Sequence, residues 1–156
     1  MKILALSALT LFTFVTHAQA ARVSWFGHFT IFSQSGVCPD YDPVGSRGIA
    51  RFRPQLAGTD NGNGSKLVLY QSERVLGYRI ESGRFTDTFK TVETINVGEN
   101  WGPDDTATVQ LRFVSQEPPV IEIATKFINV VAEIKNFDFM PGCSVKLRLG
   151  LTPRPN

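Results

Sequence analysis

Few side chains in this sequence have the types and spacing that catalysis or metal binding requires. His28 is the one histidine after residue 20, and it lies within an apolar segment. It could act as a general base or bind a metal. A zinc site needs further His or Cys ligands, and the Gly-x-Ser-x-Gly turn of many hydrolases does not occur in the sequence. We therefore interpret His28 as a hydrogen-bonded strand histidine and predict no metal and no cofactor.

Two pairs of acidic residues, Asp40 with Asp42 and Asp104 with Asp105, offer the carboxylates that glycoside hydrolysis uses. Trp101 precedes the second pair and is a candidate glycan contact. Gly-Pro-Asp-Asp is also an ordinary turn composition, and sequence spacing alone places no cleft between two carboxylates. A carboxylate-based hydrolase that acts on glycans is therefore the weakest of the functions we consider.

The stretch GTDNGNGSKL, residues 58–67, carries four oxygen-bearing side chains within six residues. Counted from Asp60, the third and fifth positions of a calcium loop are glycines, and the twelfth is Gln71, which carries no charge. Two Asn-Gly pairs indicate tight turns instead. We predict a hairpin connection that binds no metal. Asn63-Gly64-Ser65 is also an N-glycosylation pattern, which matters only in a eukaryotic secretory pathway.

Six cations lie on the polar faces of three predicted strands. They are Arg47, Arg51, Arg53, Arg112, Lys146 and Arg148. If these strands are neighbours, the side chains form a basic stripe that suits the carboxylate or phosphate groups of an anionic glycan or a lipid headgroup. We favour the other interpretation, a solvated face whose cations discourage edge pairing, because the net charge of the mature domain is close to zero.

Two cysteines, Cys38 and Cys143, are the only ones in the sequence. They lack the CxxC spacing of redox and zinc motifs, and an even number in an exported chain predicts a disulfide. The bond would join the first and last parts of the mature domain.

The first 20 residues have the features of a secretory signal: Lys2, an apolar run too short to span a bilayer, and Ala18-Gln19-Ala20 at the cleavage position. We expect a mature domain of residues 21–156 that is secreted or periplasmic and has no membrane span. Without Lys2 it carries 15 basic and 14 acidic residues. That balance argues against a nucleic-acid partner.

Apolar and polar residues alternate over most of the chain, which predicts half-buried strands. The predicted strands are 23–32, 48–53, 66–70, 75–80, 85–97, 106–114, 120–124, 127–134 and 144–151. The first is so rich in aromatic and β-branched residues that we expect both of its faces to be covered. Residues 127–134 also fit a helical spacing, but their β-branched content favours a strand.

The sequence thus predicts one all-β domain, an antiparallel sandwich or flattened barrel of about eight strands closed by Cys38–Cys143. The absence of catalytic motifs favours a non-enzymatic binding or structural module, with a cell-surface or anionic glycan as candidate partner. A carrier of a small apolar ligand is the alternative, because a β-barrel of this size can enclose one molecule.

Overall fold

The computed structural model describes residues 23–38, 40, 42–56, 65–71, 74–80, 86–96 and 107–154. These residues form nine strands and one short 3-10 helix: β1 (Ser24–Ser35), β2 (Arg47–Arg53), β3 (Ser65–Gln71), β4 (Arg74–Ile80), β5 (Lys90–Thr91), β6 (Glu93–Asn96), β7 (Gln110–Glu117), β8 (Ile128–Lys135), η1 (Phe137–Phe139) and β9 (Ser144–Arg154). The prediction of an all-β fold is confirmed.

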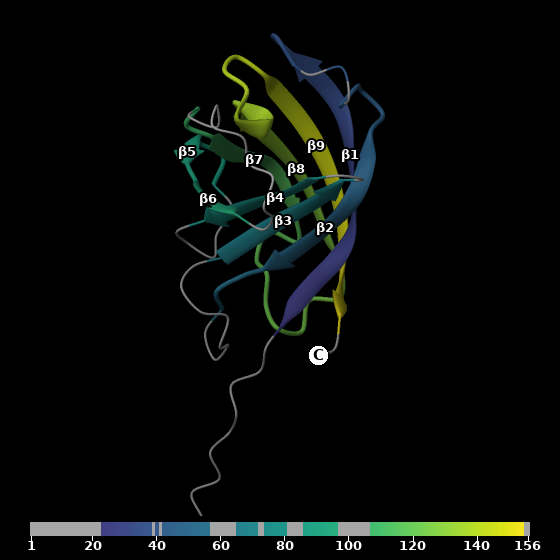
Figure 1. Ribbon diagram of the computed structural model, residues 1–156. Coiled ribbons are helices and arrows are strands. Elements are labelled where there is room, and N and C mark those ends of the chain that lie inside the picture. Colours follow the sequence, from purple (N-terminus) through teal and green to yellow (C-terminus); the bar gives the residue numbers. More distant parts are fainter. Residues whose placement is uncertain are drawn as a thin grey trace, which may run out of the picture.

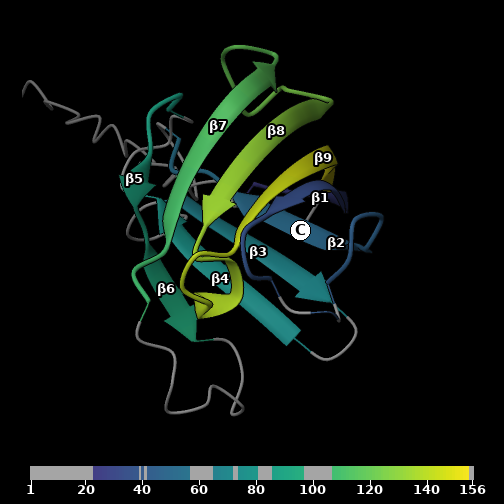
Figure 2. The same cartoon turned by 90° about the horizontal axis from the view of Figure 1, so that it is seen from above.

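All nine strands belong to one antiparallel sheet with the order β5-β7-β8-β9-β1-β2-β3-β4-β6. Only Val92 separates β5 from β6 in the sequence, yet β5 pairs with β7 and β6 pairs with β4, at opposite ends of this order. The sheet is therefore nearly closed into a barrel, and Figures 1 and 2 show the strands curving around a common interior. Of the two predicted architectures, the barrel is the one observed.

The alternation seen in the sequence sorts side chains between the interior and the outer face. On β9, Val145, Leu147, Leu149 and Leu151 are buried, while the residues between them lie outside. Large interior side chains from β1 and β2, namely Trp25, Phe29 and Phe52, are fully buried in the same cluster. The interior of the described barrel is thus filled by packed side chains, as is usual for barrels of this size.

The first and last long strands, β1 and β9, pair over almost their whole length, from Ser24 opposite Arg154 to Ser35 opposite Ser144. This pairing requires Gly27. A Cβ atom at that position would lie 1.8 Å from the carbonyl oxygen of Gly150. Glycine therefore lets the two backbones approach closely in the middle of the pair.

The two ends of the barrel are covered differently. At the disulfide end, Cys38 and Cys143 are bonded with an S–S distance of 2.08 Å, which confirms the predicted pair. There η1 buries Phe137 and Phe139. At the opposite end, the indole Nε1 of Trp25 donates a hydrogen bond to the carbonyl oxygen of Thr125, 3.1 Å away.

Three strand predictions are wrong in detail. Residues 85–97 were predicted as one strand, but the described residues of this range form two, β5 and β6, with Val92 between them. Residues 120–124 form no strand, because the two prolines before them lack the amide hydrogens that a ladder needs and the Thr125 hydroxyl accepts a hydrogen bond from the Glu122 amide to make a turn. The strand β1 is not covered on both faces, since His28 and Phe32 are exposed. The ambiguous segment 127–134 is a strand, as predicted, and corresponds to β8.

The predicted signal, residues 1–20, lies outside the described residues. Within the described part of the chain, no helix is long and apolar enough to cross a membrane. The disulfide is consistent with an extracytoplasmic location, because such bonds persist in oxidising compartments.

Candidate anion-binding face

Four neighbouring strands, in the order β9-β1-β2-β3, carry seven cations and no acidic residue. The cations alternate with buried residues and therefore lie on the outside of the barrel. We call this surface the basic face, and it comprises Arg47, Arg51, Arg53, Lys66, Lys146, Arg148 and Arg154. The near-neutral total charge of the protein thus conceals an uneven distribution of charge over its surface.

Protection of a sheet edge does not explain the basic face. Cations often lie on edge strands, where they discourage association with other sheets. All four strands of the basic face are instead paired on both sides. Moreover, Arg53 of β2 lies directly opposite Lys66 of β3, so the cations continue from one strand to the next.

Phe26, on the outer face of β1, organises the first cluster of cations. The guanidinium carbon of Arg51 lies 5.0 Å from the centroid of the Phe26 ring, and that of Arg154 lies 5.2 Å from it. Both distances allow a cation–π interaction. Arg53 and Lys66 lie near the same end of the barrel, so the cluster contains four cations. Stacking restrains the two guanidinium groups before any ligand arrives.

A second cluster lies toward the disulfide end. Thr30 of β1 is paired with Arg47 of β2 on one side and with Arg148 of β9 on the other. Arg148 also stacks on Phe32, with 5.4 Å between the guanidinium carbon and the ring centroid. Thr30 is four residues from Phe26, so the two clusters are about 13 Å apart along the strand.

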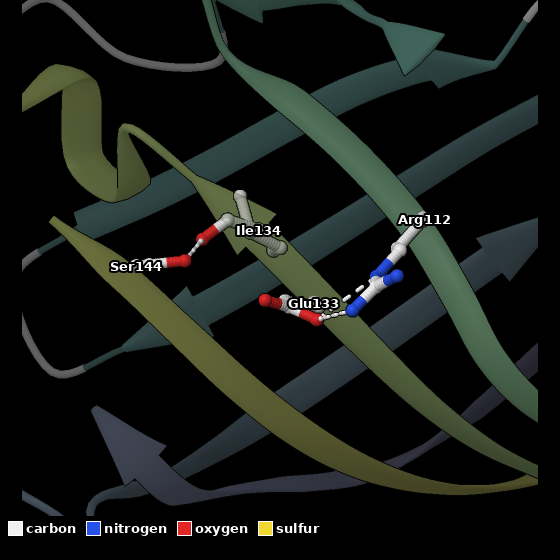
Figure 3. Close-up of polar contacts among 4 residues, drawn as sticks. All are labelled: Arg112, Glu133, Ile134 and Ser144. Carbon is white, nitrogen blue, oxygen red and sulfur yellow. Dashed lines mark hydrogen bonds and ion pairs between the residues drawn. The ribbon is translucent and has the colours of Figure 1, made fainter. Parts of the chain in front are cut away.

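Arg112, which the sequence grouped with these cations, lies elsewhere. It belongs to β7, and β8 separates that strand from β9. Its Nε donates to the Glu133 carboxylate over 2.9 Å, and Figure 3 shows its side chain directed at Glu133. Glu133 is also paired with Lys146 in the β8–β9 ladder, so it partly offsets the charge of Lys146 at the border of the basic face.

The predicted acidic pair Asp40 and Asp42 does not face a common cleft. Asp40 is exposed, whereas Asp42 is 3% exposed and accepts a hydrogen bond from the Gln71 amide at 2.6 Å. Burial raises the pKa of Asp42, although the Gln71 hydrogen bond and the positive charge of Arg74 oppose this effect. Burial, and then the charge of Asp42, raise the pKa of the Tyr78 phenol. Asp42 and Tyr78 are buried, so their ionisation affects stability.

The remaining candidates are placed as follows. His28 is exposed on the outer face of β1, within the basic face and between Ile49 and Gly150. Trp101, Asp104 and Asp105 lie outside the described residues, as do residues 57–64 with Asn63. The strands that flank residues 57–64, β2 and β3, are antiparallel partners, as a hairpin connection requires. Among the described residues, no group of three or more His, Cys, Asp or Glu side chains is placed to hold a metal.

Sequence reasoning missed two members of the basic face, Lys66 and Arg154, and the role of Phe26, on which two of its arginines stack. Lys66 lay on the polar side of a predicted strand but was not connected with the arginines, because strand order is not visible in the sequence. Arg154 lay beyond the predicted end of its strand at residue 151. Phe26 was assigned to a covered strand and not to a surface that restrains cations. Comparisons of the chain with models of protein families, with curated proteins and with solved structures found no match.

Proposed function

We propose that this protein is an extracytoplasmic binding module without catalytic activity, and that its basic face binds an acidic polysaccharide. The observation that carries the proposal is the acid-free surface of seven cations on four paired strands. Arginine forks match carboxylate and sulfate groups in geometry and charge. The proposal of export rests on the disulfide and on the signal-like sequence of residues 1–20.

Several features favour a flexible polymer over a flat lipid surface. The strands that carry the basic face curve around the interior of the barrel, as Figure 2 shows. Their cations lie on the convex outside. A planar bilayer would touch only part of such a surface, whereas a chain can wrap around it. The two clusters, about 13 Å apart, suit charges that repeat along a polymer. Phe32, which is exposed, adds a ring surface that can pack against the C–H groups of sugars.

The interior favours a binding function on the surface over the alternative of a carrier. Trp25, Phe29 and Phe52 are fully buried and fill the described barrel together with the aliphatic residues of the core. Phe137 and Phe139 are buried at the disulfide end. An apolar ligand would have to displace these packed side chains, which is costly in a close-packed interior.

A matched pair of double variants tests the proposal. Arg51→Gln/Lys66→Gln removes one arginine and one lysine from the basic face. Lys90→Gln/Lys135→Gln removes the same number of positive charges from β5 and β8, outside that face. Affinity for polygalacturonate and for heparin is measured by isothermal titration calorimetry, after melting temperatures establish that each variant is folded.

We expect the first variant to lose affinity by about tenfold or more and the second by less than about twofold, because only the first removes contacts to the anion. Equal losses of affinity in the two variants would show that the polysaccharide responds only to the total charge of the protein. That result would refute binding at the basic face. Tighter binding to DNA or to anionic lipid vesicles than to either polysaccharide would show that the partner is not an acidic polysaccharide.

A further inference from the structure

A shallow groove of about 320 Å³ borders the basic face on the outside of β7, β8 and β9. Its lining includes Ser115, Gln116, Glu117, Asn129, Val131 and Arg148. Arg148 belongs both to this groove and to the basic face. A ligand that lies on the basic face can therefore continue into the groove without leaving the protein surface.

A β-bulge in β7 shapes the groove. The pairing of β7 with β8 shifts between Phe113 and Ser115, which leaves Val114 without a partner in the ladder. Such a bulge bends its strand and redirects side chains, and bulges are frequent beside functional sites. Beyond the bulge, the Gln116 amide nitrogen donates to the carbonyl oxygens of Pro118 and Pro119 at 2.7 and 3.0 Å. These bonds fix the orientation of the Gln116 amide.

The groove has opposite charges at its two sides. Val131 of β8 is paired with Arg148 of β9 on one side and with Ser115 of β7 on the other. Two residues further along the same strands, Asn129 of β8 is paired with Glu117 of β7. Arg148 and Glu117 are two strands apart across the sheet and two residues apart along it. From the usual strand spacing and rise per residue, their Cα atoms are on the order of 12 Å apart. One side of the groove can thus donate hydrogen bonds to an anion, and the other can accept them from hydroxyl groups.

The aromatic ring of Phe127 and the backbone of Gly150 lie beside these polar groups. Gly150 presents no side chain on the outer face of β9. The Phe127 ring and the Asn129 amide oxygen each come within 3.8 Å of the point where a Cβ of Gly150 would lie. Phe127 is 48% exposed, so a large part of its ring is open to a ligand.

We propose that the groove binds one uronic acid unit of the polysaccharide, which rests on the proposed function of the basic face. The sugar carboxylate accepts hydrogen bonds from Arg148, the hydroxyl groups at the other side donate to Glu117, and the Asn129 amide bonds a hydroxyl between them. A unit that carried anionic groups at both sides would be repelled by Glu117. The groove therefore selects a carboxylated sugar over a densely sulfated one.

The experiment compares a trisaccharide of galacturonic acid with its counterpart in which each carboxylate is reduced to a neutral alcohol. Binding is measured by calorimetry to the full-length protein and to three variants. Asn129→Ala removes the central amide of the groove, and Arg148→Gln removes its cation. Gln55→Ala is the control, because it removes an exposed amide outside the groove.

We expect the protein to prefer the charged trisaccharide, and Asn129→Ala to weaken its binding by about fivefold or more. Arg148→Gln should abolish the preference for the charged sugar, and Gln55→Ala should change neither affinity. If Arg51→Gln/Lys66→Gln weakens polysaccharide binding while Asn129→Ala leaves the trisaccharide affinity unchanged, the groove proposal is refuted and the basic face stands. If Asn129→Ala weakens trisaccharide binding while Arg51→Gln/Lys66→Gln leaves polysaccharide affinity unchanged, the proposed function of the basic face is refuted and the groove proposal is supported. Binding of neither ligand refutes both.

Discussion

Arg51 and Arg154 stack on one ring, that of Phe26, with their guanidinium carbons 5.0 and 5.2 Å from its centroid. The two arginines come from β2 and β9, which lie on opposite sides of β1 in the sheet. The pairing of β1 with both β2 and β9 thus brings two like charges to one aromatic side chain. An anion that binds there finds two guanidinium groups already restrained, so less conformational entropy is lost on binding.

This arrangement predicts that Phe26→Leu weakens polysaccharide binding although it changes no charge. We expect a loss of about threefold to tenfold, because each guanidinium loses a cation–π contact that restrains it. Phe89→Leu is the matched control. Phe89 also contacts two cations, Arg112 at 4.6 Å and Lys135 at 4.0 Å, but it lies outside the basic face. Calorimetry in which both variants lose equal affinity would contradict the role of Phe26.

Binding to the basic face should weaken steeply with salt. Exposed charges are screened within about 8 Å at physiological ionic strength, and binding to a polyanion releases its counterions. Between about 0.05 and about 0.5 M sodium chloride we expect the dissociation constant to rise about tenfold or more. A titration at several salt concentrations measures this. Affinity that is independent of salt would show that the cations do not carry binding.

Removal of the disulfide should destabilise the fold substantially. Cys38 and Cys143 are 105 residues apart, so the bond closes a long loop in the unfolded chain. In the chain-entropy model a loop of this length contributes about 5 kcal/mol. We expect Cys38→Ala/Cys143→Ala to lower the free energy of unfolding by roughly that amount in urea titrations. A loss below about 1 kcal/mol would mean that the unfolded chain is already constrained by other means.

Asp42 predicts a dependence of stability on pH. Burial raises its pKa in the folded protein above the ordinary value of 3.8. The folded state therefore holds the proton more tightly than the unfolded chain. The stability that this proton contributes is fully present below about pH 3.8 and is lost as the pH rises through the folded-state pKa.

The variant Asp42→Asn removes this titration and can still accept the hydrogen bond from Gln71. We expect it to gain stability relative to the native protein as the pH rises from about 4 to about 7, because only the native protein loses the contribution of the Asp42 proton. Thermal melts across this range provide the measurement. Asp40→Asn is the control, since Asp40 is exposed on the same segment. If the melting temperatures of Asp42→Asn and the native protein differ by the same amount at every pH, the proposed titration of Asp42 is contradicted.

The sequence was informative where a pattern is local. Alternation along Ser144–Leu151 predicted β9, and β-branched content decided between strand and helix for β8. The disulfide followed from a count of two cysteines. The segment 120–124 was misjudged because its apolar residues alternate like a strand while its hydrogen bonds form a turn.

The basic face could be predicted only in part, because the order of strands in the sheet decides which of its residues are neighbours. Arg47 and Arg148 are far apart in the sequence and share the neighbour Thr30 only because β1 lies between β2 and β9. Arg112 has the same alternating context as Arg148, yet β8 separates the two and supplies Glu133 as a partner. No local pattern distinguishes these two arginines.

The central claim is that an acidic polysaccharide lies on the outside of β9, β1, β2 and β3. Its most direct test is a nuclear magnetic resonance titration of the labelled protein with a short galacturonic acid oligosaccharide. We predict that the largest shift changes involve the amides of these four strands and the Nε–H signals of Arg51, Arg148 and Arg154. Changes centred on the ring signals of the interior residues Phe29 and Phe52, or around Asp42, would contradict the account.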